Sequence, residues 1–385
     1  MLKFIKYYPV NWTDGMKLTR EHFVSWEQAI HDSIRDGSNQ RLTSYNYGLL
    51  PPIPGVERSL ELEVIVDRRG LIRVVLKSCR AITPAGARIE VVNMEGTDIH
   101  TSIGQLTDEF NFQNHNGKTL YVVLSVNLFE RKPFGEPIGG EQPQRFPYSI
   151  PAYSIKVVPE DQYEDVGMWH LPVAKLVVQQ NAAQLIDTYI PPSSTMESHY
   201  DLARLCDETA VFLNTMEKDT GIILQKIYTR KQTTLTEIAE HLCDRMMGWF
   251  STHIPAFRWT ARENAPIYFF ASLSSLARVM KNALEMRSGS GREEFINYLT
   301  DWDEFNLQQG EFEALLNDLV LLNYNHQDIS DAVIKLRRVC SKMQQVFAKL
   351  AKLDFIGKEK DPGIIVTQRT AKEADKKTKS GFWKD

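Results

Sequence analysis

The histidines are the first residues to test for chemistry, because imidazole serves as an acid, a base or a metal ligand near neutral pH. His22 has no second histidine or carboxylate at a ligand spacing such as that of HExxH. We therefore expect a hydrogen-bonded structural histidine. His241, Cys243 and Asp244 are closely spaced, but on a helix the first two point to different faces. The sequence predicts no metal site and no cofactor.

Motifs that build catalytic sites are also absent from the sequence. Ser288-Gly289-Ser290-Gly291 lacks the GxxxxGK[ST] frame whose lysine and amides hold phosphate, so we interpret it as a hinge or loop. Neither a GxSxG elbow nor the Asp and Glu cluster of a metal hydrolase occurs. Catalytic groups can converge from distant positions, which leaves an enzyme open as a hypothesis. The expectation is that the protein is not an enzyme.

Composition is that of an ordinary globular protein. Hydrophobic residues make up 43% and charged residues 24% of 385 residues, a length that suits two domains. The net charge of -4 gives no excess of Lys and Arg for nucleic acid or an anionic membrane. The four cysteines form no CxxC pair, so we expect small buried hydrophobes.

The N-terminus carries no recognisable export signal, because its apolar run is short and interrupted by charge. Elsewhere no apolar run approaches the length of about 18 residues that a membrane-spanning helix needs. We therefore predict a cytoplasmic protein without direct membrane insertion.

Residues 56–190 show the alternation of half-buried strands. Strands are predicted at 60–66, 71–76, 88–92, 119–126, 153–158 and 173–178. Gly70 and Gly86 fall at tight turns between them. The stretch 132–151, rich in Pro and Gly, is predicted to be a long exposed loop. The pattern indicates an antiparallel β-sandwich domain over residues 1–192.

Helical periodicity begins after Pro191-Pro192. Apolar residues three and four apart predict a first amphipathic helix of more than thirty residues. A second helix is expected from an N-cap within Thr233 to Glu237 as far as Phe250, and Pro255 and Pro266 are expected to frame a loop. Further helices are predicted over 267–287, after Gly291, and from about 311 and 327.

The fold class predicted from these patterns is therefore α+β and multidomain. An N-terminal antiparallel β-sandwich precedes an α-helical bundle over residues 193–356. Residues 357–385 are dense in charge and predict a disordered tail.

Five short segments occur in order along the first half of the chain. The first runs from Val10 to Phe23, and the others are Tyr47-Gly48-Leu49, Cys79 to Gly86, Leu171 to Leu176, and Tyr189-Ile190-Pro191-Pro192. Together they resemble the TssK family, the adapter subunits of the type VI secretion baseplate, a contractile injection system. Arg20-Glu21 replaces the Pro-Gln that usually precedes the His-Phe pair of the family.

The resemblance implies a structural protein that assembles with others. TssK-like proteins are homotrimers whose N-terminal β domain is similar to the shoulder domain of phage receptor-binding proteins and precedes a helical bundle. TssF- and TssG-like wedge proteins and an envelope-anchoring complex are the implied partners, and the inner face of the cell envelope is the implied location. The α/β head of better-known members is expected to be missing, since strand and helix do not alternate after about residue 328.

Two sets of contact residues follow. The motif matches expected to contact the wedge are Trp12, Met16, Leu18, His22 and Phe23. The alternative is that they pack the N-terminal segment on its own sandwich. The residues expected at an oligomer interface are Leu202, Leu205, Phe212, Met216, Ile223 and Ile227, unless later helices of the same protomer cover them.

A second hypothesis for the function comes from the shoulder-domain similarity. It is a phage-tail-like receptor-binding protein that recognises surface carbohydrate through its β domain and aromatic side chains. The helical C-terminal half argues against this hypothesis, because receptor recognition normally needs a distal binding module.

Overall fold

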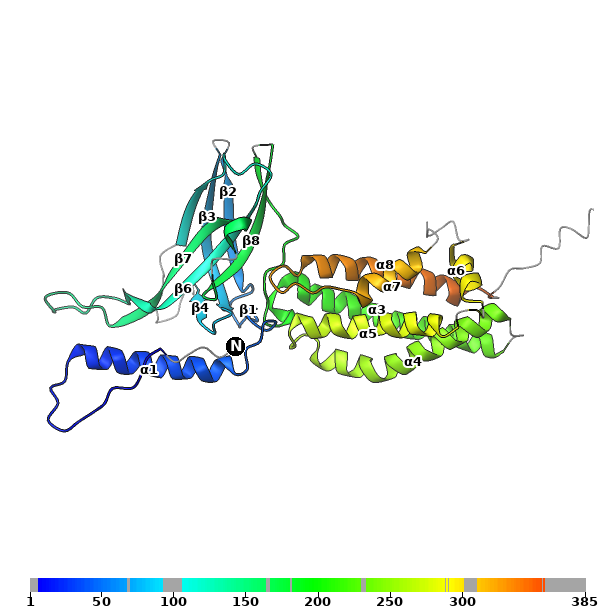
Figure 1. Ribbon diagram of the computed structural model, residues 1–385, viewed down its shortest axis with the longest axis horizontal. Coiled ribbons are helices and arrows are strands. Elements are labelled where there is room, and N and C mark those ends of the chain that lie inside the picture. The colour runs from blue at the N-terminus through cyan, green and yellow to red at the C-terminus, as the bar shows by residue number, and fades with distance from the viewer. Residues whose placement is uncertain are drawn as a thin grey trace, which may run out of the picture.

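The computed structural model describes residues 6–67, 70–92, 106–163, 167–180, 182–229, 233–287, 289, 291–300, 310–354 and 356. Figure 1 shows a β-rich half and a helical half arranged one beside the other along the long axis of the molecule. Antiparallel sheets precede the helices, so the fold is α+β as the patterns predicted.

Two antiparallel sheets form the β half among the described residues. In the first sheet, the long strand β3 (Leu71–Ile82) pairs with β1 (Gly48–Leu49), β2 (Leu60–Val66), β4 (Arg88–Val91) and β5 (Leu106–Asn111). In the second, the order is β7 (Tyr148–Pro159), β6 (Thr119–Phe134), β8 (His170–Gln179) and β9 (Ala182–Leu185), and a short helix α2 (Glu160–Tyr163) follows β7. Alternate side chains of both sheets, such as Val74 and Val122, share one buried core.

The predicted loop over 132–151 is wrong at both of its ends. Lys132 pairs with Ile150, and Phe134 pairs with Tyr148, so β6 and β7 continue into a two-stranded ribbon that projects from the sandwich (Figure 1). Each strand of such a ribbon has a free edge, where the missing N–H of a proline costs little. Pro133 and Pro151 therefore do not prevent pairing, and the irregular connection is confined to residues 135–147.

Helix α1 (Arg20–Asn39) was not predicted from the sequence. It lies along the lower side of the sandwich in Figure 1. Ala29 and Asp32 are the buried residues of this helix. Asp32 Oδ2 accepts hydrogen bonds from the backbone N–H groups of Lys6 at 2.6 Å and Tyr7 at 3.1 Å. A buried carboxylate, rather than an apolar stripe, thus fixes the N-terminal segment to this helix.

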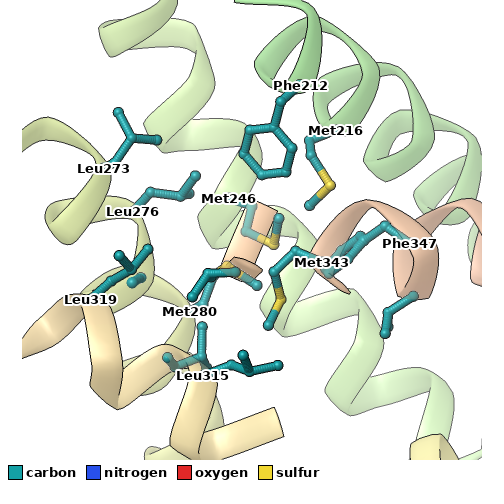
Figure 2. Close-up of a cluster of buried hydrophobic side chains, with 14 of the residues drawn as sticks. Phe212, Met216, Met246, Leu273, Leu276, Met280, Leu315, Leu319, Met343 and Phe347 are labelled. Atoms are coloured by element: carbon teal, nitrogen blue, oxygen red, sulfur yellow. The ribbon is translucent and has the colours of Figure 1, made fainter. Parts of the chain in front are cut away.

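The helical half is a bundle whose core is continuous through its length. Its elements are the 3-10 turn η2 (Met196–Ser198) and the helices α3 (Tyr200–Tyr228), α4 (Thr234–Thr260), α5 (Pro266–Glu285), α6 (Arg292–Thr300), α7 (Glu311–Val320) and α8 (Ser330–Lys352). Figure 2 shows Phe212 and Met216 of α3 facing Met280 of α5 and Met343 of α8. Methionine is flexible enough to fill the irregular spaces between such helices.

Two details of the helical prediction were wrong. Pro255 lies inside α4, so the turn to α5 takes only residues 261–265. Ile254 and Phe257 pack on the bundle core on either side of the proline, and this packing holds the helix together despite one lost backbone hydrogen bond. The capping box of α4 is formed by Thr233 and Thr236 instead of a glutamate.

The first bundle helix, α3, has 29 residues, close to the predicted length. No helix in the described ranges is both long and apolar enough to cross a membrane.

Candidate partner-binding surface

The first motif, residues 10–23, lies on the surface of the protein. The exposed fractions of Trp12, Leu18 and Phe23 are 47%, 58% and 51%, while Met16 and His22 are half-buried. The ring of Trp12 lies 6.1 Å from that of His22 and 6.5 Å from that of Phe23. The aromatic residues of the motif therefore form a small cluster that stays open to solvent, which does not fit the alternative that the motif packs on its own sandwich.

His22 has a structural role at the start of α1. Its Nδ1 accepts a hydrogen bond from the backbone N–H of Thr19 at 3.2 Å, which satisfies one of the donors left free at a helix N-terminus. Across the described residues, no group of three or more His, Cys, Asp or Glu side chains could hold a metal ion.

Helix α1 continues the exposed apolar area. Phe23, Trp26, Ile30 and Ile34 follow one another at steps of three, four and four, so at about 100° per residue they form one stripe. Their exposed fractions are 51%, 47%, 39% and 61%. At the same rotation per residue, the buried Asp32 lies on the far side of the helix from this stripe, and the buried Ala29 lies beside Trp26 at its edge.

We call Trp12, Leu18, Phe23, Trp26, Ile30 and Ile34 the N-terminal apolar surface. Single exposed apolar residues are normal, but a contiguous group of large ones marks an interaction site. Only Trp12, Leu18 and Phe23 of this surface were predicted from the sequence as contact residues, because helix α1 itself was not predicted.

The predicted oligomer interface on α3 is contradicted by burial. Leu202, Met216 and Ile223 are 0% exposed, Leu205 is 1%, and Ile227 and Phe212 are 3% and 6% exposed. All six side chains pack in the core of the same protomer's bundle. They have no surface left for a second chain, so the alternative that later helices cover the stripe is correct.

The other motif segments meet where the sandwich joins the bundle. Gly48 has φ +113°, and a Cβ on it would lie 2.1 Å from the carbonyl oxygen of Pro192. Leu49 donates its N–H to the same oxygen at 2.8 Å and pairs with Ala81 across β1 and β3. Segments around residues 48, 81 and 192 therefore fit together at one point, which only glycine permits at position 48.

The connection between α7 and α8 completes this junction. Nε2 of the buried His326 donates to the carbonyl oxygen of Tyr47 at 2.9 Å, and its Nδ1 accepts from the Tyr324 hydroxyl at 2.7 Å, a tautomer assigned from these two partners. Burial lowers the pKa of His326 to about 4, so the imidazole is neutral at pH 7. The Tyr189 hydroxyl donates to the carbonyl oxygen of Gln327 at 2.7 Å.

One ion pair also joins the two halves. Lys175 Nζ lies 2.9 Å from Asp328 Oδ2, and both side chains are mostly buried. Burial alone would lower the pKa of Lys175, but the carboxylate of Asp328 outweighs it and raises the pKa above its usual value. The fourth motif, residues 171–176, thus contributes to the junction as well.

The motifs therefore have two different roles. Those at 47–49, 79–86, 171–176 and 189–192 hold the protomer together, whereas the one at 10–23 faces solvent. His326, Gln327 and Asp328 were not identified from the sequence. Their partners lie far away along the chain, and no local motif predicts such contacts.

The cysteines offer no nucleophile. Cys79, Cys206 and Cys243 are buried, as expected, and Cys340 is half-buried. Burial raises the pKa of Cys79 and of Cys206 to about 12, so neither thiol ionises near neutral pH. Ser288 and Ser290 of the predicted hinge and the predicted tail at 357–385 lie outside the described residues.

Comparison with known proteins gives matches among solved structures. No protein-family model matches the chain, and no curated protein matches it. A crystal structure of TssK aligns with 88% of this chain and 69% of its own length, at 14% identity and a TM-score of 0.47. TssK from the type VI secretion system of EAEC, in complex with nanobody nb18, aligns with 84% of this chain and 99% of its own, at 13% identity and a TM-score of 0.45.

A third similar structure is the baseplate complex from the type VI secretion system. It aligns with 89% of this chain and 99% of the compared chain, at 14% identity and a TM-score of 0.48. The similar structures thus come from the same system as the family that the five sequence segments resemble.

Proposed function

We propose that this chain is a structural subunit of a type VI secretion baseplate, in which it forms a homotrimer and binds TssF- and TssG-like wedge proteins. The observation that carries the proposal is the exposure of the first motif. This segment resembles TssK, yet it adds little to the protomer's own core. Large apolar side chains that remain in water gain free energy when a partner covers them.

The stripe on α1 supports self-association. Its steps of three and four residues are those of side chains that interlock between neighbouring helices. Three copies of α1 around a threefold axis would each bury Trp26, Ile30 and Ile34 of this stripe against the others and leave Phe23 with the motif at its end, which a cyclic homo-oligomer achieves with one repeated contact. The proposed oligomer interface therefore lies on α1, and not on the α3 residues predicted from the sequence, which are buried in the bundle.

The motif at 10–23 supports contact with the wedge. One solved structure with this similarity is a TssK–TssF–TssG baseplate subcomplex, which aligns with 87% of this chain at 15% identity and a TM-score of 0.46. In the proposed role the protein acts by geometry and not by turnover, and it occupies the cytoplasmic side of the cell envelope. An envelope-anchoring complex is the further partner that this role requires.

Co-purification tests the wedge contact. The chain is co-expressed with TssF- and TssG-like proteins from the same source, and the complex is recovered through a tag on the TssG-like protein. The variant Trp12→Ser/Phe23→Ser should lower recovery about tenfold or more, because aromatic anchors dominate such interfaces. The control Trp259→Ser/Tyr268→Ser removes two aromatic side chains that are 77% and 64% exposed on the bundle, and it should co-purify normally. Failure of the unmodified chain to bind either wedge protein would refute the proposal.

A further inference from the structure

A groove lies on the outer face of the second sheet. Its volume is about 970 Å³, and its floor is made by β6 and β7. Ser125 is paired with Ser154, and Val123 with Lys156, so these four side chains lie on the same face of the sheet. Val122 and Leu124, which alternate with them on β6, belong to the sandwich core. The strand period therefore places hydroxyl groups and a lysine on the floor of the groove.

Aromatic side chains form part of the groove wall. Phe129 and Trp169 lie edge to face, with 6.1 Å between their ring centroids. Lys6 Nζ lies 5.1 Å from the centroid of Phe129, and the Arg35 guanidinium lies 5.7 Å from that of Trp169. Both cations thus lie beside the faces of aromatic rings, where they are attracted to the π electrons.

Positive charge exceeds negative charge in the lining. Lys6, Arg35, Lys132 and Lys156 line the groove, and Glu130 is its carboxylate. Arg35 is paired with the buried Asp32. The ammonium groups of Lys6, Lys132 and Lys156 form no ion pair with any residue in the described ranges. Within the described part of the chain, three lysine charges in the groove are therefore without an ion-pair partner.

His170 is also affected by the positive charge of the groove. It lines the groove, and its Nδ1 is buried without a hydrogen-bond partner among the described residues. Burial first, and then the charge of Lys156, hold the pKa of His170 below its usual value. A carboxylate in the groove would offset this charge.

We propose that this groove binds an extended acidic segment of a partner protein, with an apolar side chain of that segment against Phe129 and Trp169. The three free lysines come from separate places, namely the N-terminal segment, the β6–β7 ribbon and β7. A compact anion needs donors that converge on one point, whereas an extended chain with several carboxylates can pair with each lysine in turn. The hydroxyl groups of Ser125 and Ser154 are placed to hydrogen-bond the backbone of that chain.

This inference depends on the groove and not on the proposed baseplate role, and the two are tested by different residues. The probe is a fluorescein-labelled peptide of six glutamates with one Phe and one Leu, and its binding to the full chain is followed by fluorescence anisotropy. The groove variant is Lys132→Glu/Lys156→Glu. The matched control is Lys218→Glu/Arg245→Glu, which makes the same charge change at exposed positions of α3 and α4.

The expected result has three parts. The unmodified chain binds the acidic peptide, and a peptide with glutamine in place of glutamate binds at least about tenfold more weakly. The groove variant loses about tenfold or more in affinity, while the control variant, whose circular dichroism is compared in parallel, changes by less than about twofold. Added salt weakens binding, since the contacts are charged and partly exposed.

Two results would overturn the proposal. The first is equal binding of the acidic peptide by the groove variant and the unmodified chain, or equal binding of the acidic and the glutamine peptides. The second is tighter binding of a single-stranded thymidine oligonucleotide than of the peptide, lost in the groove variant, which would make the groove a nucleic-acid site instead.

Discussion

Gly48 is the residue at which the structure leaves least room for a side chain. Its φ of +113° is strained for any L-residue, and an added Cβ would lie 2.1 Å from the Pro192 carbonyl oxygen. Gly48→Ala should therefore lower the free energy of unfolding by about 2–5 kcal/mol, through backbone strain and overpacking together.

Gly55→Ala is the matched control for this variant. Gly55 also has a positive φ, +85°, but no atom lies within 4 Å of an added Cβ. It should lose only about 1 kcal/mol, from strain alone. Urea unfolding of both variants measures the difference, and equal losses would contradict the close contact between residues 48 and 192.

His326 should make stability depend on pH. Its pKa is about 4 in the folded protein and about 6.5 in an unfolded chain, so between these values the unfolded state binds more protons. Stability is therefore complete above about pH 6.5 and falls as the pH drops towards 4. Across this pH range, His326 should lower the free energy of unfolding by about 3 kcal/mol.

His326→Gln isolates this contribution, because every other titratable group is common to both proteins. The free energy of unfolding of the unmodified chain should fall more steeply between pH 6.5 and 4 than that of the variant, by as much as about 3 kcal/mol. Parallel pH profiles would mean that His326 is not buried as a neutral imidazole in the junction.

These two residues also differ in how visible they are in the sequence. Gly48 belongs to a recognisable motif, and glycine between apolar residues suggests a special backbone conformation. His326 contacts Tyr47 across 279 residues of sequence, with no spacing rule to reveal the pair. The same separation hides Asp328, whose partner is Lys175.

At the scale of elements, periodicity predicted most elements that pack one face on the core, but it missed β5, whose Leu106 and Phe110 pack on the sandwich. In β2, alternate side chains pack half-buried on the core, and in α3 and α5 every third or fourth side chain is buried, so these elements were predicted. Helix α1 departs from this rule. Its apolar stripe faces solvent, and its buried side carries Asp32, which binds the N-terminal segment. The sequence pattern therefore did not predict a helix that packs apolar side chains on a core.

The exposed stripe on α1 leads to a prediction about assembly. Trp26→Ser/Ile34→Ser removes two side chains that are 47% and 61% exposed, so the protomer should keep its fold and its helical content. If copies of α1 pack on one another, the sedimentation coefficient at micromolar concentration should fall towards that of a monomer.

Val211→Ser/Ile334→Ser serves as the control for this change. These apolar side chains are 63% and 56% exposed on α3 and α8 of the bundle. The control should sediment as the unmodified chain does. If the sedimentation coefficient falls only in the bundle variant, the self-association surface lies on the bundle and not on α1.

At the scale of the whole molecule, the sandwich and the bundle are joined by buried polar contacts rather than by a flexible linker. The backbone of Gly48 and Leu49 meets Pro192, and the connection before α8 returns to Tyr47, Lys175 and Tyr189. Such a junction transmits the orientation of one half to the other.

Light scattering coupled to size exclusion, on the purified full chain, tests the proposed homotrimer most directly. A homotrimer has a mass near three times the 44.2 kDa of one chain, and this is the expected result. A mass of one chain at micromolar concentration, with the N-terminal apolar surface still exposed, would contradict it.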